Sequence, residues 1–561
     1  MLFTTPNFDR ALNKILENLK PRQKKCRQCE NKFEIFEEDI ALYKKLLVPP
    51  PKLCPECRKQ RRFGFYNTVL KFYKKQDART GQEIISTFHP ESRHKIYDLK
   101  YWWSDQWGGE DCAREYDFSK SFFNQFDNLN LSVPHPAITH YWKGVINSPY
   151  TIAGVNLKNC YLVSVAARLE NVHYAYWVGA SKDCLDLLNT SHCENCYELI
   201  DCYASYNCHF CHGSEECVDG YFLYDCRNCQ SCFGCTHLRH KSYCFFNKQY
   251  SKKEYLEKIR EINLGDRNIL ERYKKRFEDL LKKTVRQNLY FDSRNINCVG
   301  DQLWHSKNCY QVFRNDYGVE NVRYGADLVS GTKDCMDLWD VGPNVSLSYE
   351  AVEAVNSSNL KFVFFVRESL DLEYCIACHN CQYCFGCVGL RGKKYHIFNK
   401  KYSKEEYWKL LDKIKTKMLE GGEYGEFFPL SMSLYPYNNT YAMIEFPLKK
   451  SEVLKNGWQW YNEPKIPIDL VDIPEAIVCE ITGKQFRLIE PELNFYRKHY
   501  LPIPTKSPYQ RMLERFQKRN PSKLWKTKCD KCGEEIQTSY PPAMQKELKI
   551  YCKKCYNKEV G

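Results

Sequence analysis

A segment that occurs twice constrains the fold of this chain more than any other sequence feature. Residues 226–255, CRNCQSCFGCTHLRHKSYCFFNKQYSKKEY, recur as residues 378–407, CHNCQYCFGCVGLRGKKYHIFNKKYSKEEY. The match extends upstream, where the tripeptide KDC at residues 182–184 returns at residues 333–335. We therefore expect the middle of the chain to be a tandem pair of modules of roughly 100 residues each.

Each module contains a shorter period, marked by Asn or another polar residue before a small or apolar one. In the first module the mark recurs at every twelfth position apart from one shorter step, and in the second module the period slips slightly. Such a period predicts a β-solenoid whose repeats stack about 4.8 Å apart, with an amide ladder along one edge and cysteines in a narrow core. Whether one rung contains one repeat or two stays open. The marking residues are Asn147, Asn159, Asn171, Asp183, Asn195, Asn207, Glu216 and Asn228, then Asn308, Asn321, Asp334, Asn359 and Asn380.

Helices are expected where the modules end. The motif Ser-x-x-Glu forms a capping box, so one helix should begin at Ser251 and another at Ser403. These helices would cover the open end of a solenoid, whose strand edges are otherwise unpaired. Residues 252–286 contain 12 basic and 7 acidic residues and predict a basic helical bridge between the modules. The aromatic-rich residues 76–146 are expected to cap the other end of a stack.

The 31 cysteines indicate the cellular compartment. Residues 1–20 lack the basic-then-apolar pattern of an export signal, and no run approaches the roughly 18 apolar residues of a membrane span. So many cysteines without an export signal favour a reducing environment, where Cys binds metal or packs in cores. We therefore expect a cytoplasmic protein with no membrane association.

Paired C-x2-C motifs stand near both ends of the chain. Two such pairs can surround one Zn²⁺ ion with four thiolates, and a closed site of this kind is structural, not catalytic. The metal replaces the core that a unit of about 35 residues cannot build for itself. The sequence thus predicts about two zinc ions per chain. The expected ligands are Cys26, Cys29, Cys54 and Cys57 at the first site and Cys529, Cys532, Cys552 and Cys555 at the second.

The N-terminal segment CRQCENKFEIFEEDIALYKKLLVPPPKLCPECRKQRR resembles the bacterial family named "probable zinc-ribbon" domain. That family has a C-x2-C knuckle, a Phe-containing segment, an acidic run leading to a Tyr, a Pro-rich approach and a closing C-x-x-C-R. The C-terminal KCDKCGEEIQTSYPPAMQKELKIYCKKCY resembles a zinc ribbon at the ends of large uncharacterised bacterial proteins. The resemblance covers about 90 residues and implies zinc binding at the cysteines named above, with little about activity.

A third, decayed ribbon appears when residues 479–515 are aligned with residues 26–62 without gaps. The Phe, Tyr and Pro positions and one Arg are shared. Of the four ligand positions only Cys479 survives, and the other three hold Thr482, Ser507 and Gln510. Because one thiolate cannot hold zinc, we expect a metal-free ribbon that serves as a docking surface.

Two further cysteine tetrads leave two roles open. Their consecutive C-x2-C spacing could wrap a zinc ion or an iron–sulfur cluster, although the ferredoxin pattern is incomplete. Lining the last rung of each module is the alternative we prefer, because Cys behaves as a small hydrophobe and already fills the module core. At Cys208 the second module has Leu360, which indicates a packing position. The tetrads are Cys226, Cys229, Cys232 and Cys235, and Cys378, Cys381, Cys384 and Cys387.

Positive charge is concentrated at the two ends. Residues 1–75 and residues 497–561 each have a net charge of +10, whereas the middle has a net charge of −6. Basic segments attract phosphate backbones through counterion release. The run after the first ribbon, Arg58, Lys59, Arg61 and Arg62, is followed by aromatic residues that could stack on bases, so we expect it to contact nucleic acid. A solvated basic face over buried aromatics is the alternative.

These features predict a mainly β protein of tandem short-period β-solenoid modules with helical caps, flanked by small zinc ribbons. The expected domains are 1–75 (helix, zinc ribbon and basic tail), 76–146 (cap), 147–250 (module A), 251–290 (bridge), 291–402 (module B), 403–470 (helix and linker), 471–521 (degenerate ribbon) and 522–561 (zinc ribbon).

For function we expect a non-enzymatic zinc protein that binds RNA or single strands through its basic terminal ribbons, since the chain has no GxSxG, phosphate-binding Gly loop or HExxH motif. A protein-interaction scaffold is the first alternative. Redox or iron–sulfur chemistry at the repeated tetrads is the second.

Overall fold

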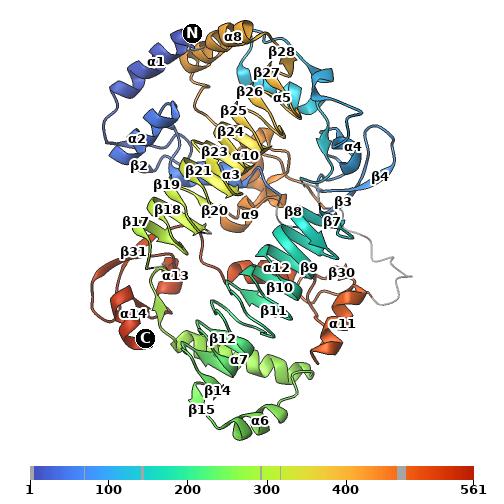
Figure 1. Ribbon diagram of the computed structural model, residues 1–561, viewed down its shortest axis with the longest axis vertical. Helices are drawn as coiled ribbons and strands as arrows, with labels where there is room; N and C mark the ends of the chain where they lie inside the picture. Colours follow the sequence, from blue (N-terminus) through green and yellow to red (C-terminus); the bar gives the residue numbers. More distant parts are fainter. Residues whose placement is uncertain (1–4, 68–69, 140–143, 291–292, 316, 464–475) are drawn as a thin grey trace.

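The structure is a computed structural model that describes residues 5–67, 70–139, 144–290, 293–315, 317–463 and 476–561 (Figure 1). The described part is strand-rich, which confirms the expected mainly β body, and two long parallel sheets dominate it. We call these the first stack (β7–β14) and the second stack (β17–β27). In Figure 1 the second stack occupies the upper half of the molecule and the first stack the lower half.

The first stack is built from parallel strands whose register follows the short period of the sequence. Leu185 lies opposite Tyr197, and Leu188 lies opposite Ile200, so each residue faces the one at the twelfth position after it. Isolated bridges such as Tyr203 with Glu215 continue the same offset where no strand is assigned. The strands are β7 (Val145–Ile146), β8 (Thr151–Lys158), β9 (Tyr161–Gly179), β10 (Lys182–Ser191), β11 (Tyr197–Ile200), β12 (Val218–Tyr224), β13 (Gln230–Thr236) and β14 (Ser242–Phe245), closed by the antiparallel β15 (Lys248–Gln249).

The second stack follows the same plan with one difference in register. Ala351 lies opposite Val363, which is the offset of the first stack, whereas the step from Leu338 to its partner Ala351 is one position longer. Its strands are β17 (Ile296–Asp301), β18 (Lys307–Asn315), β19 (Glu320–Arg323), β20 (Ala326–Leu328), β21 (Lys333–Val341), β22 (Val345–Ser346), β23 (Tyr349–Val355), β24 (Ser357–Arg367), β25 (Leu370–Glu373), β26 (Gln382–Phe385) and β27 (Lys394–Ile397), closed by the antiparallel β28 (Lys400–Lys401).

The repeated Asn residues have two structural roles. Their backbone is left-handed, for example at Asn159 with φ of +53°, and Asn tolerates this conformation better than other residues with a side chain. Their side chains also bond along the stack: Nδ2 of Asn147 donates to Oδ1 of Asn159 at 3.0 Å, and Asn159 donates likewise to Asn171 at 3.0 Å. A similar row joins Asn297, Asn308 and Asn321 in the second stack. The structure therefore contains the predicted amide rows over part of each stack.

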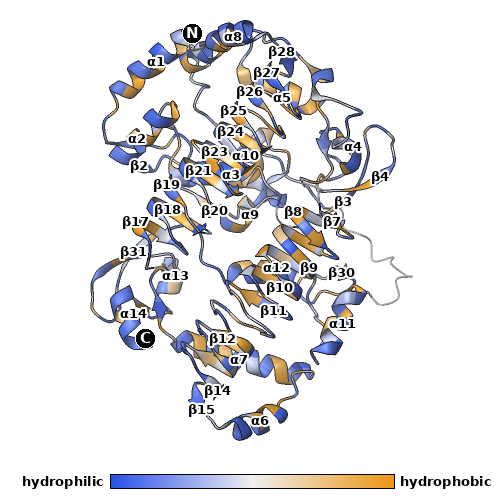
Figure 2. Cartoon of the chain, viewed as in Figure 1, coloured by the Kyte–Doolittle hydropathy of each residue, from blue (hydrophilic) through white to orange (hydrophobic). Residues whose placement is uncertain are grey.

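Cysteine lines the interior of both stacks, as the sequence predicted, although Val, Leu and Ala outnumber it in the second stack. The buried cluster of the first stack is mostly Cys, with Leu, Val and Ala. The thiol of Cys208 is fully buried and donates to the carbonyl oxygens of Tyr206 at 3.4 Å and Cys217 at 3.3 Å. Leu360, the residue aligned with Cys208 in the sequence, is also fully buried in the second stack. Figure 2 shows apolar residues along the strands of both stacks and hydrophilic residues over α14.

Helices cover the ends of the stacks. Both predicted capping boxes are present, with Ser251 and Glu254 at the start of one helix and Ser403 and Glu406 at the start of another. Ring contacts with Phe385 and Phe398 place Phe122, from the expected capping region, against the final strands of the second stack. Apart from the helices of the small ribbons and α4 (Leu99–Trp102), the helices of the described chain are α1 (Pro6–Glu17), α5 (Phe122–Ser132), α6 (Lys252–Arg260), α7 (Arg267–Lys283), α8 (Lys404–Glu420), α9 (Ala442–Glu445) and α10 (Lys450–Lys455), with short 3-10 turns at Gly109–Cys112, Leu430–Met432 and Tyr437–Asn439.

In the described part of the chain, no helix combines the length and apolar character needed to cross a membrane.

Candidate metal centre

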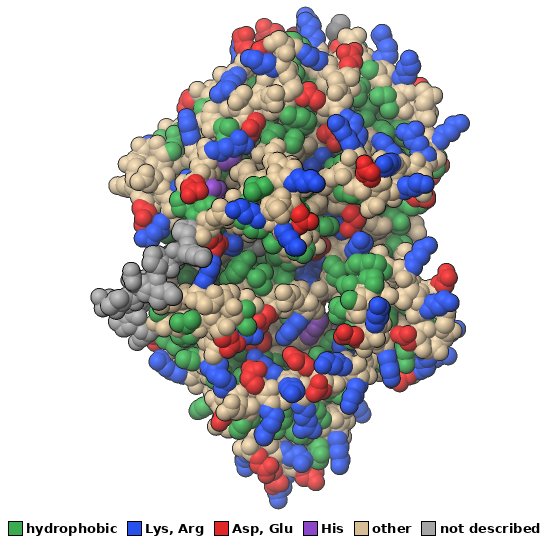
Figure 3. Space-filling view, turned by 180° about the vertical axis from the view of Figure 1, so that it is seen from behind, with side chains coloured by type: hydrophobic (Ala, Val, Ile, Leu, Met, Phe, Trp, Pro, Cys, Tyr) green, Lys and Arg blue, Asp and Glu red, His purple; other side chains and the backbone are tan. Residues whose placement is uncertain are grey.

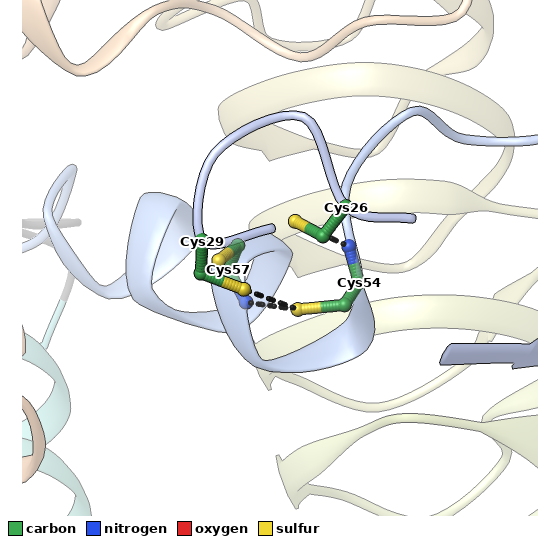
Figure 4. A group of neighbouring side chains, drawn as sticks. All are labelled: Cys26, Cys29, Cys54 and Cys57. Carbon is green, nitrogen blue, oxygen red and sulfur yellow. Dashed lines mark hydrogen bonds between the residues drawn. The ribbon is translucent and has the colours of Figure 1, made fainter. Parts of the chain in front are cut away.

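The N-terminal ribbon presents its four cysteines on two tight turns. The antiparallel strands β1 (Arg22–Lys25) and β2 (Lys32–Ile35) flank the first turn, and the helices α2 (Glu37–Leu46) and α3 (Pro55–Phe63) follow. Cys54 is the N-cap of α3, and its sulfur accepts a hydrogen bond from the backbone N–H of Cys57 at 3.5 Å. The two knuckles therefore face each other across a short gap (Figure 4).

The four sulfur atoms of this ribbon have the spacing of a tetrahedral site. All four lie within 4.8 Å of one another, and the sulfurs of Cys29 and Cys54 are 3.7 Å apart. Four sulfurs about 2.3 Å from a central zinc ion would be roughly 3.8 Å apart. Cys29 is exposed and the other three cysteines are buried, so the group lies just beneath the surface.

The C-terminal ribbon repeats this geometry with different connections. Strands β31 (Trp525–Lys528) and β32 (Glu535–Thr538) flank its first knuckle, and β33 (Ile550–Tyr551) leads to α14 (Lys553–Val560), with the short α13 (Pro542–Gln545) between. The sulfurs of Cys532 and Cys552 are 3.9 Å apart, and the four sulfurs again lie within 4.8 Å of one another. Each ribbon could therefore hold one metal ion, as the sequence predicted.

Backbone N–H groups donate to sulfurs in both ribbons, as that of Cys54 does to Cys26 and that of Cys552 does to Cys529, each at 3.2 Å, and such donors favour a thiolate. Burial raises the pKa of Cys529, but the N–H groups of Cys552, Cys532 and Lys531 outweigh burial and lower that pKa to about 6. In the N-terminal ribbon, the hydrogen bond between the Cys54 and Cys57 sulfurs lowers the pKa of Cys54 and raises that of Cys57. Four thiolates with no open position can fix the chain, but they leave no place for a substrate.

The two repeated tetrads are not arranged as metal sites. In the described residues, only the two ribbons bring three or more Cys, His, Asp or Glu ligand atoms within 4.8 Å of one another. The eight tetrad cysteines are buried, and their sulfurs donate to backbone carbonyls, as Cys226 does to Cys235 at 3.6 Å and Cys378 to Cys387 at 3.6 Å. The four cysteines of a tetrad lie within one twelve-residue step of the stack, as the pairing of Cys232 with Cys244 shows, and they line its interior without forming a group that could hold an ion, so the geometry favours core lining.

The predicted phosphate contact by the basic run after the first ribbon is contradicted by its burial. Arg58, Lys59, Arg61 and Arg62 are only 1%, 8%, 7% and 1% exposed. They lie on α3, which packs against β21 of the second stack. A cation held inside the protein cannot exchange its counterions for phosphates. Neither this prediction nor its alternative, a solvated basic face, is correct.

These basic side chains instead neutralise buried carboxylates of the second stack. Nε of Arg58 is 2.7 Å from Asp337, and a guanidinium nitrogen of Arg62 is 3.0 Å from the same carboxylate. Arg61 pairs with Glu350 at 2.8 Å. Asp337 and Glu350 are fully buried. Sequence reasoning did not find these acids as partners, although Asp337 stands in the stretch that aligns with Asp186 of the first module.

The decayed ribbon keeps the ribbon fold and docks in the equivalent way on the first stack. It contains β29 (Ile477–Val478), β30 (Gln485–Phe486), α11 (Glu490–Lys498) and α12 (Pro508–Gln517). Arg511 and Arg515 pair with Asp186 at 3.2 and 2.7 Å, as Arg58 and Arg62 pair with Asp337. The remaining thiol, Cys479, is buried. The decayed ribbon thus packs on this chain's own first stack, and docking of another protein stays a prediction.

Comparison with known proteins adds little. No family model matches this chain, and no curated protein matches it. One solved structure with some similarity is described as a "putative acetyltransferase" from Desulfovibrio desulfuricans, at 10% sequence identity over 51% of this chain and 81% of that chain, with a TM-score of 0.10. A likeness at this TM-score supports no argument about fold or activity, so functional conclusions must come from the geometry described above.

Proposed function

We propose that this chain is a zinc-binding, non-enzymatic binding protein with one structural zinc ion in each four-cysteine ribbon. The sulfur spacing and the N–H groups around the sulfurs support zinc, since a four-thiolate set with tetrahedral spacing suits it. When bound, the ion joins the two knuckles of each ribbon and so fixes the start of the helix that follows. In the N-terminal ribbon that helix is α3, which supplies the cations for the buried acids.

The two stacks are, in this proposal, short-period β-solenoids that act as rigid spacers. The regular register offset and the amide ladder support one repeat per rung. A body built in this way has little internal freedom, because each rung is bonded to both neighbours. The ribbons would then be held at fixed positions around it.

The surface that best fits nucleic acid is the C-terminal ribbon, and its unpaired lysines are the observation that carries this assignment. Between Lys523 and the end of the chain, nine lysines and five acidic residues are exposed. Among the described residues, Lys531 is the one member of the nine with an ion-pair partner, Glu559. The ammonium of Lys523 also lies 5.4 Å from the ring of Trp525. Free cations beside an aromatic ring suit a single strand, where phosphates and bases are both accessible.

Over the described residues, the rear face of the molecule has no comparable basic patch (Figure 3). Figure 3 shows basic and acidic side chains interspersed over the rear face. Mixed charge of this kind has no net attraction for a polyanion beyond about one Debye length. Nucleic acid is therefore not expected to bind through the rear face.

The test is a salt titration of single-stranded RNA binding with a four-lysine variant. Replacing Lys526, Lys528, Lys553 and Lys554 with Ala should flatten the log–log salt dependence by up to about three units, at about 0.7 units per phosphate contact. The matched control replaces four exposed lysines far from the ribbon and should keep the parent slope. Equal slopes for the ribbon variant and the parent would contradict this proposal. The control lysines are Lys252, Lys253, Lys409 and Lys413.

Protein docking is a second candidate, favoured by exposed apolar residues on the decayed ribbon. Val478, Ile481 and Tyr500 are 57%, 58% and 81% exposed. Exposed large apolar side chains gathered on one small unit are typical of an interaction surface. A pull-down from native cells with and without nuclease separates the two functions. A partner that survives nuclease and is lost in an Ile481→Ser/Tyr500→Ser variant would favour docking.

A further inference from the structure

Residues 73–102 contain no Cys, yet they have the fold of the C-terminal ribbon. The hairpin of β3 (Tyr73–Gln76) and β4 (Glu83–Ser86) pairs Tyr73 with Ser86, as β31 and β32 pair Trp525 with Thr538. After the hairpin come β5 (Ile96–Tyr97) and α4 (Leu99–Trp102), in the order in which β33 and α14 follow β32. Apart from the short α13, which has no counterpart between β4 and β5, the two segments therefore have the same elements in the same order.

The turns of the two segments also have the same hydrogen bonds. The backbone N–H of Asp77 donates to the carbonyl of Gln82 at 2.8 Å, and that of Cys529 donates to Glu534 at 2.9 Å. Gly81 and Gly533 close these turns with φ of +71° and +76°, a conformation that glycine adopts without strain. Asp77 thus stands at the position of the first cysteine ligand, and Asp98, the N-cap of α4, stands at that of Cys552, the N-cap of α14.

Both segments attach to equivalent places in the fold. Strand β5 pairs in parallel with β6 (His135–Pro136), which precedes the first stack. Strand β33 pairs in parallel with β16 (Arg286–Gln287), which precedes the second stack. The separation between these two short strands equals that between the KDC tripeptides of the two modules. Each stack therefore starts beside one segment of this type.

The carboxylate of Asp77 makes the connections that a metal would make. Its Oδ1 accepts hydrogen bonds from the backbone N–H of Thr80 at 2.8 Å and from the Thr80 hydroxyl at 3.0 Å. Its Oδ2 accepts from the backbone N–H of Asp98 at 2.7 Å, just as the sulfur of Cys529 accepts from the N–H of Cys552 at 3.2 Å. One carboxylate therefore joins the first knuckle to the start of the closing helix. With its oxygens engaged in this way, Asp77 is not arranged to bind a cation.

We propose that residues 73–102 are a fourth ribbon, in which the Asp77 carboxylate replaces the metal and Asp77, Thr80, Asp98 and Tyr101 occupy the four ligand positions. The four ribbons then form two tandem clamps, residues 26–102 and residues 479–556, each reaching both stacks. Each clamp has one four-cysteine end and one metal-free end.

The distribution of metal between the clamp ends is asymmetric. Both four-cysteine ribbons contact the second stack or the strand that leads to it, through Arg58 and Asp337 in one case and through β33 and β16 in the other. Both metal-free ribbons attach to the first stack or the strand that leads to it, through Arg511 and Asp186 and through β5 and β6. Loss of metal should therefore loosen the contacts of the two four-cysteine ribbons, which include the hydrogen bond from Tyr556 to Asp225 of the first stack, and leave the contacts of the two metal-free ribbons in place.

The first experiment restores the missing ligands. The variant Asp77→Cys/Thr80→Cys/Asp98→Cys/Tyr101→Cys, measured by elemental analysis, should bind one more zinc ion than the parent chain. The matched control keeps Tyr101 and carries only the three other changes, and its stoichiometry should stay at or near the parent value because the fourth ligand is missing. A folded four-cysteine variant with the parent's zinc content would overturn the proposal. The comparison is with the parent, so a parent chain without zinc would refute the proposed function separately.

The second experiment needs no variant and covers the case in which the four-cysteine chain fails to fold. Amide hydrogen exchange of the full chain is compared with and without a chelator. Exchange should speed up by at least tenfold in residues 22–63 and 525–560, and residues 73–102 and 477–517 should keep their protection. Equal loss of protection in residues 73–102 would overturn the assignment, because a ribbon joined by Asp77 does not depend on metal.

Discussion

Replacing Asp337 with Ala is the most direct test of how the N-terminal ribbon is attached to the second stack. Asp337 is fully buried and lies 2.7 Å from Nε of Arg58 and 3.0 Å from a guanidinium nitrogen of Arg62. Both arginines are 1% exposed, so the substitution leaves two buried cations with too little compensating charge. Removing one partner from a buried ion pair costs about 3–5 kcal/mol. We expect the opening free energy of α3 to fall by this amount.

Amide hydrogen exchange of α3 is the appropriate assay, because a chain with several units does not unfold in one two-state step. At about 1.4 kcal/mol per factor of ten, the loss corresponds to roughly a 100- to 3,000-fold faster exchange of the α3 amides. The matched control is Glu30→Ala. Glu30 pairs with Lys25 at 3.1 Å with both side chains more than 60% exposed, so its loss should cost about 0–1 kcal/mol.

The reasoning would be refuted if Asp337→Ala changed α3 exchange no more than Glu30→Ala does. That result would mean that Arg58 and Arg62 reach water or other acids when Asp337 is removed. Glu350 is one such acid, 3.9 Å from Arg62. A double variant that also replaces Arg58 and Arg62 with Met should recover part of the loss, because it removes the uncompensated cations.

Three further predictions follow from particular side chains. The parent chain should contain about two zinc ions by elemental analysis, and Cys57→Ser should lower this to about one, whereas a parent value near zero would exclude both sites. Cys208→Val should lower the opening free energy of the first stack, measured by amide hydrogen exchange, by less than about 1.5 kcal/mol, because the site requires mainly apolar volume, and a loss of bound metal would show instead that Cys208 is a ligand. Burial raises the pKa of Glu353 to about 7, with Arg367 partly opposing the rise, so the folded protein holds a proton that the unfolded chain has released above about pH 4.5. Stability should therefore fall as pH rises from about 4.5 to 7, and Glu353→Gln should flatten this part of a stability–pH profile.

The strand-rich body and both four-cysteine groups could be predicted because their signals are local. A C-x2-C pair positions two sulfurs on one turn, and an Asn at every twelfth position returns to the same edge of a regular stack. Ser-x-x-Glu at Ser251 and Ser403 likewise places the helix starts, since the capping bonds lie within one short turn. Each inference needs only the geometry of a short segment.

The basic run after the first ribbon could not be assigned in this way. Whether Arg58 and Arg62 face solvent depends on Asp337, which belongs to the second stack and lies far along the chain from both arginines. The sequence shows that this segment has many cations, but it does not show which buried acids lie beside them. The same holds for Arg511 and Asp186, where the aligned ribbon kept its arginine and lost its ligands.

By itself, then, the sequence determined which residues can bind metal and how often the chain repeats, because sulfur ligands and a short regular period act over short distances. The tertiary structure alone decided which charges are free and that a segment without cysteine can have the ribbon fold. Residues 73–102 carry no cysteine, and their ribbon fold depends on a carboxylate oxygen of Asp77 that meets the backbone N–H of Asp98. Every residue except proline has a backbone N–H, so the sequence does not indicate which one bonds to Asp77. Only the folded chain shows this hydrogen bond.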